Sequence, residues 1–321
     1  MEAYARPRVV VSKCLEFEAC RYNGDVIYNN VIKKLMDYVD FVPVCPEVEI
    51  GLGTPRETIR IVKKVHEHLL IQPSTGRDVT ADMHSFTDNY LSTVTDTDGF
   101  ILKTRSPSCG VKEVKVYAST EKGPAIGNAS GLFGGKVADR FSHLAVEEEG
   151  RLNNFTIRDR FYTKLFTLAS FRRVLPKGLD AIMAFHDNNY YLLMAYSRPT
   201  LKVMDRILIK AQENGERLTI ELYSKALHKV FNRAARNDSN RNVAREIFKR
   251  FESNLSPNEI SFFHELMQKY SDKKEPFSSI TTLLKAHAVR FDDKKLLKQT
   301  FFRPYPEILL EISDSGKGRD Y

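Results

Sequence analysis

Short hydrophobic runs alternate with segments of helical periodicity through the first half of the chain. Residues 7–13 and 41–45 are apolar runs of strand length, and residues 26–39 place apolar side chains at helical spacing between them. The same alternation continues with a helix over 80–95, a strand over 99–103, a helix over 131–141 and a strand over 143–147. Alternation at this spacing is typical of βαβ units. The pattern therefore predicts an α/β domain with a small Rossmann-like, mostly parallel sheet.

After Gly150 the pattern becomes helical almost throughout. Residues 155–175 carry apolar side chains on one helical face, and Ser256 with Glu259 forms a capping box that opens another helix. Two segments are ambiguous between helix and strand, 57–71 and 187–196. We therefore expect a catalytic domain over residues 1–150 and a mostly helical domain over residues 151–321.

Composition fits a soluble globular protein. Of the 321 residues, 42% are hydrophobic and 28% are charged, and no apolar run approaches the ~18 residues that a membrane span needs. The first residues lack the apolar core of a secretory signal, so we expect no membrane association and a cytoplasmic location. Four cysteines are too few for a disulfide scaffold in a chain of this length, and in a reducing compartment they indicate metal binding or catalysis.

Charge is divided unevenly between the two halves. Residues 1–150 hold 18 basic and 21 acidic side chains, a net charge of −3, whereas the remainder holds 31 basic and 20 acidic side chains, a net charge of +11. A basic half joined to a nearly neutral half indicates that one domain binds a polyanion while the other performs chemistry. Basic surfaces also serve solubility alone, so charge by itself favours nucleic acid only modestly.

Three of the cysteines each follow a predicted strand. Cys14 comes after residues 7–13, Cys45 ends the next strand, and Cys109 follows the strand over 99–103. Because ligands bind beyond the carboxyl ends of parallel strands, we expect these three thiols to converge at one edge of the sheet. Such an arrangement predicts a metal site built from thiolates.

Thiolate ligands select iron–sulfur clusters or zinc. Three ligands from three separate loops leave one coordination position open, which is typical of a catalytic site. Cys20 lies six residues after Cys14 and could close the site, although a buried structural role fits it as well. A closed four-cysteine zinc site would indicate an RNA-binding module without catalysis, and a four-ligand cluster would indicate electron transfer or redox sensing. Both alternatives stay open from the residues alone.

Two polar residues accompany these cysteines. Glu47 is two residues from Cys45, on the same side of an extended backbone, where its carboxylate can act as a proton shuttle. Ser106 opens the turn Ser-Pro-Ser-Cys-Gly that contains Cys109, and its hydroxyl can orient a substrate or hydrogen-bond to sulfide. Solvated glutamates at strand ends and turns rich in Ser, Pro and Gly are also common without such roles.

These segments resemble a known family. The motifs Ser-Lys-Cys-Leu at 12–15, Cys-Arg-Tyr-Asn-Gly at 20–24, Val-Cys-Pro-Glu-Val-Glu-Ile-Gly-Leu-Gly at 44–53, Pro-Arg-Glu at 55–57 and Ser-Pro-Ser-Cys-Gly at 106–110 are similar to the thiouracil desulfidase (TudS) domain. The second half, from Glu149 to Pro306, resembles the YbgA-type domain found fused behind it. Together the two resemblances cover nearly the whole chain.

The resemblance implies a [4Fe-4S] cluster on Cys14, Cys45 and Cys109, with a fourth iron free to bind the sulfur of a thiolated pyrimidine. It also implies Glu47 as the acid–base residue and Ser106 as a second functional group. Fused proteins of this type are associated with removal of sulfur from 4-thiouridine in tRNA. The implied activity is non-redox hydrolysis that yields uridine and sulfide, and it requires no protein partner.

One segment departs from the family pattern. Residues 123–135 do not match the glycine-rich pattern expected late in single-domain members, which puts in doubt how the far side of the pocket is built. Within it, Gly-Leu-Phe-Gly-Gly-Lys-Val at 131–137 superficially resembles a phosphate loop but lacks its spacing and the Ser or Thr after Lys. We interpret it as a loop and the start of a helix.

Basic residues recur near helical spacing in the second half, with Phe231 and Phe248 between them. A solvated helix face is the usual explanation for such a run, but with tRNA as substrate, phosphate contacts become the better hypothesis. The candidate RNA-binding residues are Lys229, Arg233, Arg241, Arg245 and Lys249.

Overall fold

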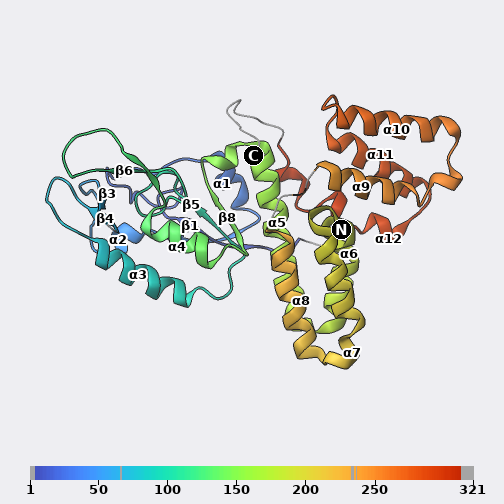
Figure 1. Ribbon diagram of the computed structural model, residues 1–321, viewed down its shortest axis with the longest axis horizontal. Coiled ribbons are helices and arrows are strands. Elements are labelled where there is room, and N and C mark those ends of the chain that lie inside the picture. Colours follow the sequence, from blue (N-terminus) through green and yellow to red (C-terminus); the bar gives the residue numbers. More distant parts are fainter. Residues whose placement is uncertain (1–3, 66, 233–234, 236, 312–321) are drawn as a thin grey trace. The chain divides into compact units, whose positions relative to one another are not determined.

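The computed structural model describes residues 4–65, 67–232, 235 and 237–311, and these form two compact units (Figure 1). Residues up to Ala169 and from Ile308 onward belong to the first unit, and Ser170–Glu307 form the second. The α/β sequence pattern of residues 1–150 lies within the first unit. Helix α5 (Phe155–Val174) runs from the first unit into the second, so the physical division falls inside a helix.

A four-stranded parallel sheet is the centre of the first unit. Its strands, in spatial order, are β2 (Asp40–Val44), β1 (Arg8–Ser12), β5 (Gly99–Leu102) and β8 (Ala145–Glu148). All three pairings are parallel, which confirms the predicted strands and the α/β fold class. The centres of the two middle strands, Val9–Val11 and Phe100–Leu102, are apolar and buried because a parallel sheet is covered on both faces. Val10 and Phe100, which pair across them, are each at most 1% exposed.

Besides part of α5, the first unit contains three helices of more than one turn. They are α1 (Asn30–Leu35), α3 (Thr80–Thr93) and α4 (Leu132–Arg140), with the single-turn α2 (Pro46–Glu49) after β2. The helices predicted over 80–95 and 131–141 are confirmed. The helix predicted over 26–39 is shorter, because Asn29 caps α1 through its side chain and the preceding Ile27 is taken into a bridge with Leu15.

A second small sheet, which the sequence did not predict, lies in the same unit. It contains β4 (Glu67–Ile71), β3 (Arg60–Lys64), β6 (Val114–Tyr117) and β7 (Gly127–Ala129) in that order. Only the β3–β6 pairing is parallel. The ambiguous segment 57–71 is therefore two antiparallel strands. Its mixed signal arises because charged residues end each strand, as at Lys63 and Lys64.

The second unit is helical in all its described elements. It contains α6 (Leu179–Ile209), α7 (Ala211–Asn214), α8 (Glu216–Val230), α9 (Asn237–Phe248), α10 (Pro257–Ser271), α11 (Phe277–Arg290) and α12 (Lys294–Leu297). Its short 3-10 helices are Leu175–Lys177, Glu252–Asn254 and Thr300–Phe302. The 3-10 helix Arg151–Asn153 lies in the first unit, and Glu307–Leu309 spans the division between the units. The ambiguous segment 187–196 is helical, within α6. The predicted capping box at Ser256 is present and starts α10.

Helix α6 is interrupted at Ser197, whose backbone is extended, and Pro199 follows in the next turn. The interruption divides α6 into a first arm before Ser197 and a second arm after it. The hydroxyl of Ser197 accepts from the backbone N–H of Thr200, so the second arm has its own N-terminal cap. His186 on the first arm contacts Asp205 on the second at 3.0 Å, and its other ring nitrogen lies 3.1 Å from the Tyr223 hydroxyl. The contact with Asp205 holds the two arms together, and the contact with Tyr223 fixes the first arm to α8.

None of the helices in the described ranges combines the length and the apolar character that a bilayer crossing requires.

Candidate active site

Three cysteines lie beyond the carboxyl ends of strands and line one cavity. Cys14 follows β1, Cys45 follows β2, and Cys109 lies in the loop after β5. The cavity has a volume of about 200 Å³, and Glu47 and Ser106 also line it. The structure thus brings together the five residues that the sequence singled out, at the edge of the sheet where parallel strands direct their ligands.

The thiols of Cys14 and Cys109 are in surroundings that disfavour a free thiolate. Burial raises the pKa of Cys14 to about 12, and it also raises the pKa of Cys109, which lies fully inside. Two contacts oppose this effect: the nearby Lys103 ammonium lowers the pKa of Cys14, and a hydrogen bond with Ser12 lowers that of Cys109. A metal displaces the proton from such a thiol because the thiolate is the ligand. Both positions are therefore suited to metal-bound sulfur.

Cys45 differs because a second thiol contacts it. The Cys20 thiol donates a hydrogen bond to Cys45, which lowers the pKa of Cys45 to about 7, and the Val48 backbone N–H adds to this effect. The same contact, together with burial, raises the pKa of Cys20. Cys45 Sγ also lies 3.9 Å from the Cys20 carbonyl oxygen. Cys20 is thus a buried neighbour of one cavity thiol, and all four cysteines are free.

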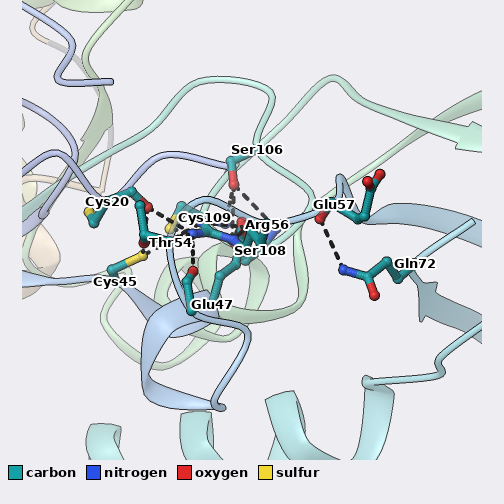
Figure 2. A network of polar contacts seen from close by, with 11 residues as sticks. Cys20, Cys45, Glu47, Thr54, Arg56, Glu57, Gln72, Ser106, Ser108 and Cys109 are labelled. Atoms are coloured by element: carbon teal, nitrogen blue, oxygen red, sulfur yellow. Dashed lines mark hydrogen bonds and ion pairs between the residues drawn. The ribbon is translucent and has the colours of Figure 1, made fainter. Parts of the chain in front are cut away.

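The Glu47 carboxylate is fixed on both of its oxygens. Arg56 donates to Oε2 from Nε at 2.9 Å and from Nη2 at 2.8 Å, and Ser108 donates to Oε1 at 2.6 Å (Figure 2). The Arg56 side chain is 4% exposed and that of Glu47 is 13% exposed, so the ion pair is shielded from water. Arg56 also donates to the carbonyl oxygens of Cys20 and Gly53, each at 2.9 Å. A single guanidinium therefore ties the carboxylate to the loops around it.

Ser106 reaches Glu47 through Ser108. The two hydroxyl oxygens are 2.9 Å apart, and because the Ser108 hydrogen is directed to Glu47, Ser106 is the donor between them. Ser106 Oγ accepts from the backbone N–H of Cys109 at 3.1 Å, while Ser108 Oγ lies 3.7 Å from Cys109 Sγ. Ser108 is therefore the serine that contacts both the carboxylate and a cavity thiol. The sequence analysis selected Ser106 and did not single out Ser108 or Arg56, although all three lie in its quoted motifs.

The turn that carries Cys109 rests on the start of α4. The backbone N–H groups of Phe133 and Gly134 both donate to the Ser108 carbonyl at 2.9 Å, and the N–H of Gly131 donates to the Gly110 carbonyl at 2.8 Å. A Cβ atom at Gly134 would lie 2.2 Å from the Cys109 carbonyl oxygen, and one at Gly131 would lie 2.6 Å from that of Ser108. Only glycine permits this approach. The segment that departs from the family pattern thus supports the Cys109 turn from behind.

A buried acid holds the loop after β5 next to Cys14. Glu149 accepts from the Thr104 backbone N–H at 2.6 Å and from its hydroxyl at 2.8 Å, and it forms an ion pair with Lys103. This contact places the Lys103 ammonium near Cys14. The sequence analysis did not single out Glu149 or Lys103; the acidic run at 147–149, directly after a predicted strand, is the pattern that could have drawn attention to this contact.

The residues around the cavity fit an iron–sulfur cluster better than a single metal ion. Within the described part of the chain, no three or more Cys, His, Asp or Glu side chains are gathered closely enough to hold one ion. Zinc requires its ligands at about 2.3 Å from a common centre, whereas each thiolate of a cluster binds a different iron and the ligands lie farther apart. Three thiols on the wall of one cavity, with Cys14 half-buried and Cys45 and Cys109 buried, suit the second arrangement.

The candidate RNA-binding residues lie in the second unit, on two helices and not on one. Lys229 is in the last turn of α8, Arg241 and Arg245 are on α9, and Lys249 follows α9; Arg233 lies outside the described residues. Arg241 pairs with Asp238 at 3.3 Å. Phe231 and Phe248 are buried in the core, where Phe248 stacks on Phe263 with ring centroids 3.7 Å apart. These two rings are structural and are not available to stack on bases.

Comparison with known proteins agrees with this geometry. Residues 9–149 match the family described as 2-thiouracil desulfurase, and residues 191–306, within the region that resembles the YbgA-type domain, match a protein family of unknown function (DUF1722). The uncharacterized protein YbbK of Bacillus subtilis (strain 168) is 36% identical over 111 residues, which are 32% of this chain and 72% of YbbK. A solved structure of the [4Fe-4S]-dependent thiouracil desulfidase TudS aligns with a TM-score of 0.36 and 25% identity, over 46% of this chain and 93% of that one.

The matched segment contains every cysteine of the cavity, the Glu47–Arg56 pair and both serines. The chain therefore belongs to the 2-thiouracil desulfurase family of enzymes through its first unit, and it carries a DUF1722 region behind that unit.

Proposed function

We propose that Cys14, Cys45 and Cys109 hold a [4Fe-4S] cluster and that the protein hydrolyses the carbon–sulfur bond of thiolated uracil, with 4-thiouridine in tRNA as its substrate. The observation that carries this proposal is an arginine-held carboxylate on the wall of a cavity to which three thiols converge, two of them buried and that of Cys14 half-buried. When bound, the cluster supplies an iron with an open position, a Lewis acid for the thiocarbonyl sulfur. The reaction consumes one water and releases uridine and hydrogen sulfide, without net redox change.

Glu47 moves the protons of this water. Arg56 donates both of its hydrogen bonds with Glu47 to Oε2, so Oε1 is the oxygen that accepts protons from the reacting water. A water that lies beside Ser108 and donates to Oε1 loses its first proton to Oε1 as its oxygen attacks C4. It loses the second proton as the carbonyl forms. Glu47 passes both protons to the departing sulfur, and the Ser106–Ser108 pair keeps Oε1 solvated between the two transfers.

The second unit offers a phosphate-binding surface for the tRNA. Along the second arm of α6, Arg198, Lys202, Arg206 and Lys210 recur every fourth residue, and all are exposed. This spacing places them in one row along the helix. Arg198 pairs with Glu246, whereas Lys202, Arg206 and Lys210 have no acidic partner among the described residues. We name these four residues the α6 basic row, and we propose it beside Lys229, Arg245 and Lys249 as the contact for the RNA backbone.

The target base must leave the stacked RNA to reach the cavity, at a cost of a few kcal/mol. Backbone contacts on the second unit would supply sequence-independent affinity that offsets this cost. Four free thiols suit a reducing compartment, and we propose the cytoplasm as the site of action.

The test is metal analysis of the full chain purified without oxygen, followed by turnover on 4-thiouridine-containing tRNA. We expect about four irons with matching sulfide per chain. Substitution of Cys14, Cys45 or Cys109 by Ser should remove iron and activity together. Glu47→Gln should keep the iron and lower turnover by roughly 10²–10⁴-fold, because the amide has the same size, keeps an oxygen toward Arg56 and cannot accept a proton. Stoichiometric zinc without sulfide would contradict the proposal and favour an RNA-binding module.

A further inference from the structure

Cys20 is the one cysteine of the chain that the proposed cluster does not use. It is 1% exposed, yet it lines the same cavity as Cys14, Cys45 and Cys109. Cys45 Sγ lies 3.9 Å from the Cys20 carbonyl oxygen, and the Arg56 guanidinium contacts both residues. Cys20 is therefore the cysteine held directly beside Cys45.

We propose that Cys20 and Cys45 form a reversible disulfide when the site has no cluster and meets a peroxide. The inference rests on the proposed function only in taking Cys45 as a cluster ligand. One thiol takes an oxygen atom from the peroxide to give a sulfenic acid and one water. The other thiol then condenses with it, which forms the S–S bond and releases a second water. Two electrons pass from the two sulfurs to the peroxide, and a dithiol reductant reverses the change.

The positions of the two residues favour this reaction over its competitors. Neither lies inside a strand: Cys20 is in the loop after β1, and Cys45 is the N-cap residue of α2. Movement of the Cys20 loop can therefore bring the sulfurs to bonding distance without breaking the sheet. Arg56 donates to the Cys20 carbonyl at 2.9 Å and has Nη2 4.0 Å from Cys45 Sγ, so it spans both residues and keeps them together. The cavity that both residues line has a volume of about 200 Å³ and admits a molecule as small as hydrogen peroxide.

The disulfide and the cluster exclude each other, because both use the sulfur of Cys45. A sulfur in a disulfide is not a thiolate ligand, so the oxidised site cannot take up iron through Cys45. The disulfide also stops oxidation at a reversible step, because a lone sulfenic acid proceeds to sulfinic acid, which thiols do not reduce. Cys20 thus preserves the ligand for later reloading of the site.

The experiment uses the full chain, stripped of iron by a chelator under reducing conditions and then treated with one equivalent of hydrogen peroxide. Thiol counting in denaturant should show the loss of two of the four thiols, and peptide mass mapping should join the Cys20 and Cys45 peptides. Iron uptake should be lost after peroxide and return after dithiothreitol. A Cys14–Cys45 or Cys45–Cys109 link, or a sulfinic acid on Cys45 with Cys20 free, would overturn the proposal.

The matched control is Cys20→Ser. This variant should take up iron as the wild type does before peroxide. After two equivalents of peroxide, one for each oxygen atom added, its Cys45 should become a sulfinic acid, and iron uptake should not return with dithiothreitol. Full recovery of the variant would also overturn the proposal. If the wild-type protein takes up no iron even when fully reduced, the cluster proposal is wrong. The disulfide proposal is tested separately, by the mass map of the Cys20 and Cys45 peptides.

Discussion

Arg56 donates two hydrogen bonds to a single oxygen of Glu47, Oε2, from Nε at 2.9 Å and from Nη2 at 2.8 Å. The other oxygen, Oε1, accepts from the Ser108 hydroxyl. The two carboxylate oxygens therefore have different roles, one for position and one for proton transfer. This division defines how each neighbour of Glu47 should respond to substitution.

Arg56→Ala should lower both stability and turnover. Removing one partner of a buried ion pair leaves an uncompensated charge, and the expected cost is about 3–5 kcal/mol in the free energy of unfolding. Arg56→Lys keeps the charge but not the two-pronged contact, so it should recover most of the stability and little of kcat. Urea unfolding and steady-state kinetics measure the two effects. Equal recovery of both by lysine would show that Arg56 acts only as a charge.

Ser108→Ala should reduce kcat more than Ser106→Ala does. Ser108 contacts Oε1 directly, whereas Ser106 reaches it through Ser108 and mainly supports the turn by accepting the Cys109 N–H. We expect KM to change little in the Ser108 variant, and we expect Ser106→Ala to weaken iron retention on dilution. A larger loss of kcat in the Ser106 variant would assign the functional hydroxyl to Ser106.

The α6 basic row should carry part of the salt dependence of tRNA binding. Replacing Lys202 and Arg206 together by Ala should lower the slope of log K against log salt by about 2, since each lost phosphate contact removes roughly one unit. Lys225→Ala is the matched control, because Lys225 is equally exposed on α8 but pairs with Glu221 at 2.6 Å. Binding that depends instead on Arg241 and Arg245 would place the RNA surface on α9.

Stability of the second unit should fall in mild acid because of His287. Burial lowers the pKa of this histidine, whose side chain is enclosed by Phe248, Phe251 and Phe291. The folded state then binds fewer protons than the unfolded state, so the stabilisation is present above about pH 6.5 and is lost as the pH falls through the folded pKa. His287→Leu should flatten the dependence of the urea midpoint on pH. A wild-type midpoint that rises in acid would refute this assignment.

Much of the first unit could be predicted from its sequence because parallel strands are continuous apolar runs. Val9–Val11 and Phe100–Leu102 needed only their hydrophobicity to be recognised, and the cysteines after them followed from the topology of such sheets. The second sheet escaped prediction because its strands are short and half exposed, and its order depends on residues far apart, such as Val62 beside Tyr117.

The site itself was less predictable than its cysteines. Three residues belong to the site through contacts between separate loops: Arg56, Ser108 and Lys103. No local sequence pattern distinguishes an arginine that pairs with Glu47 from one that faces water. Similarly, Phe231 and Phe248 looked like partners of a basic surface because helical spacing does not reveal which face is covered. Their burial is a property of the packed helices.

The support of the Cys109 turn by Gly131 and Gly134 also limits how this site can be transplanted. The turn and the start of α4 are separated by some twenty residues of sequence, yet each fixes the backbone of the other. A protein engineer who grafts the Ser-Pro-Ser-Cys-Gly segment into another scaffold would obtain the cysteine without its conformation. The transferable unit is the pair of segments together with strands β6 and β7, which lie between them and belong to the second sheet.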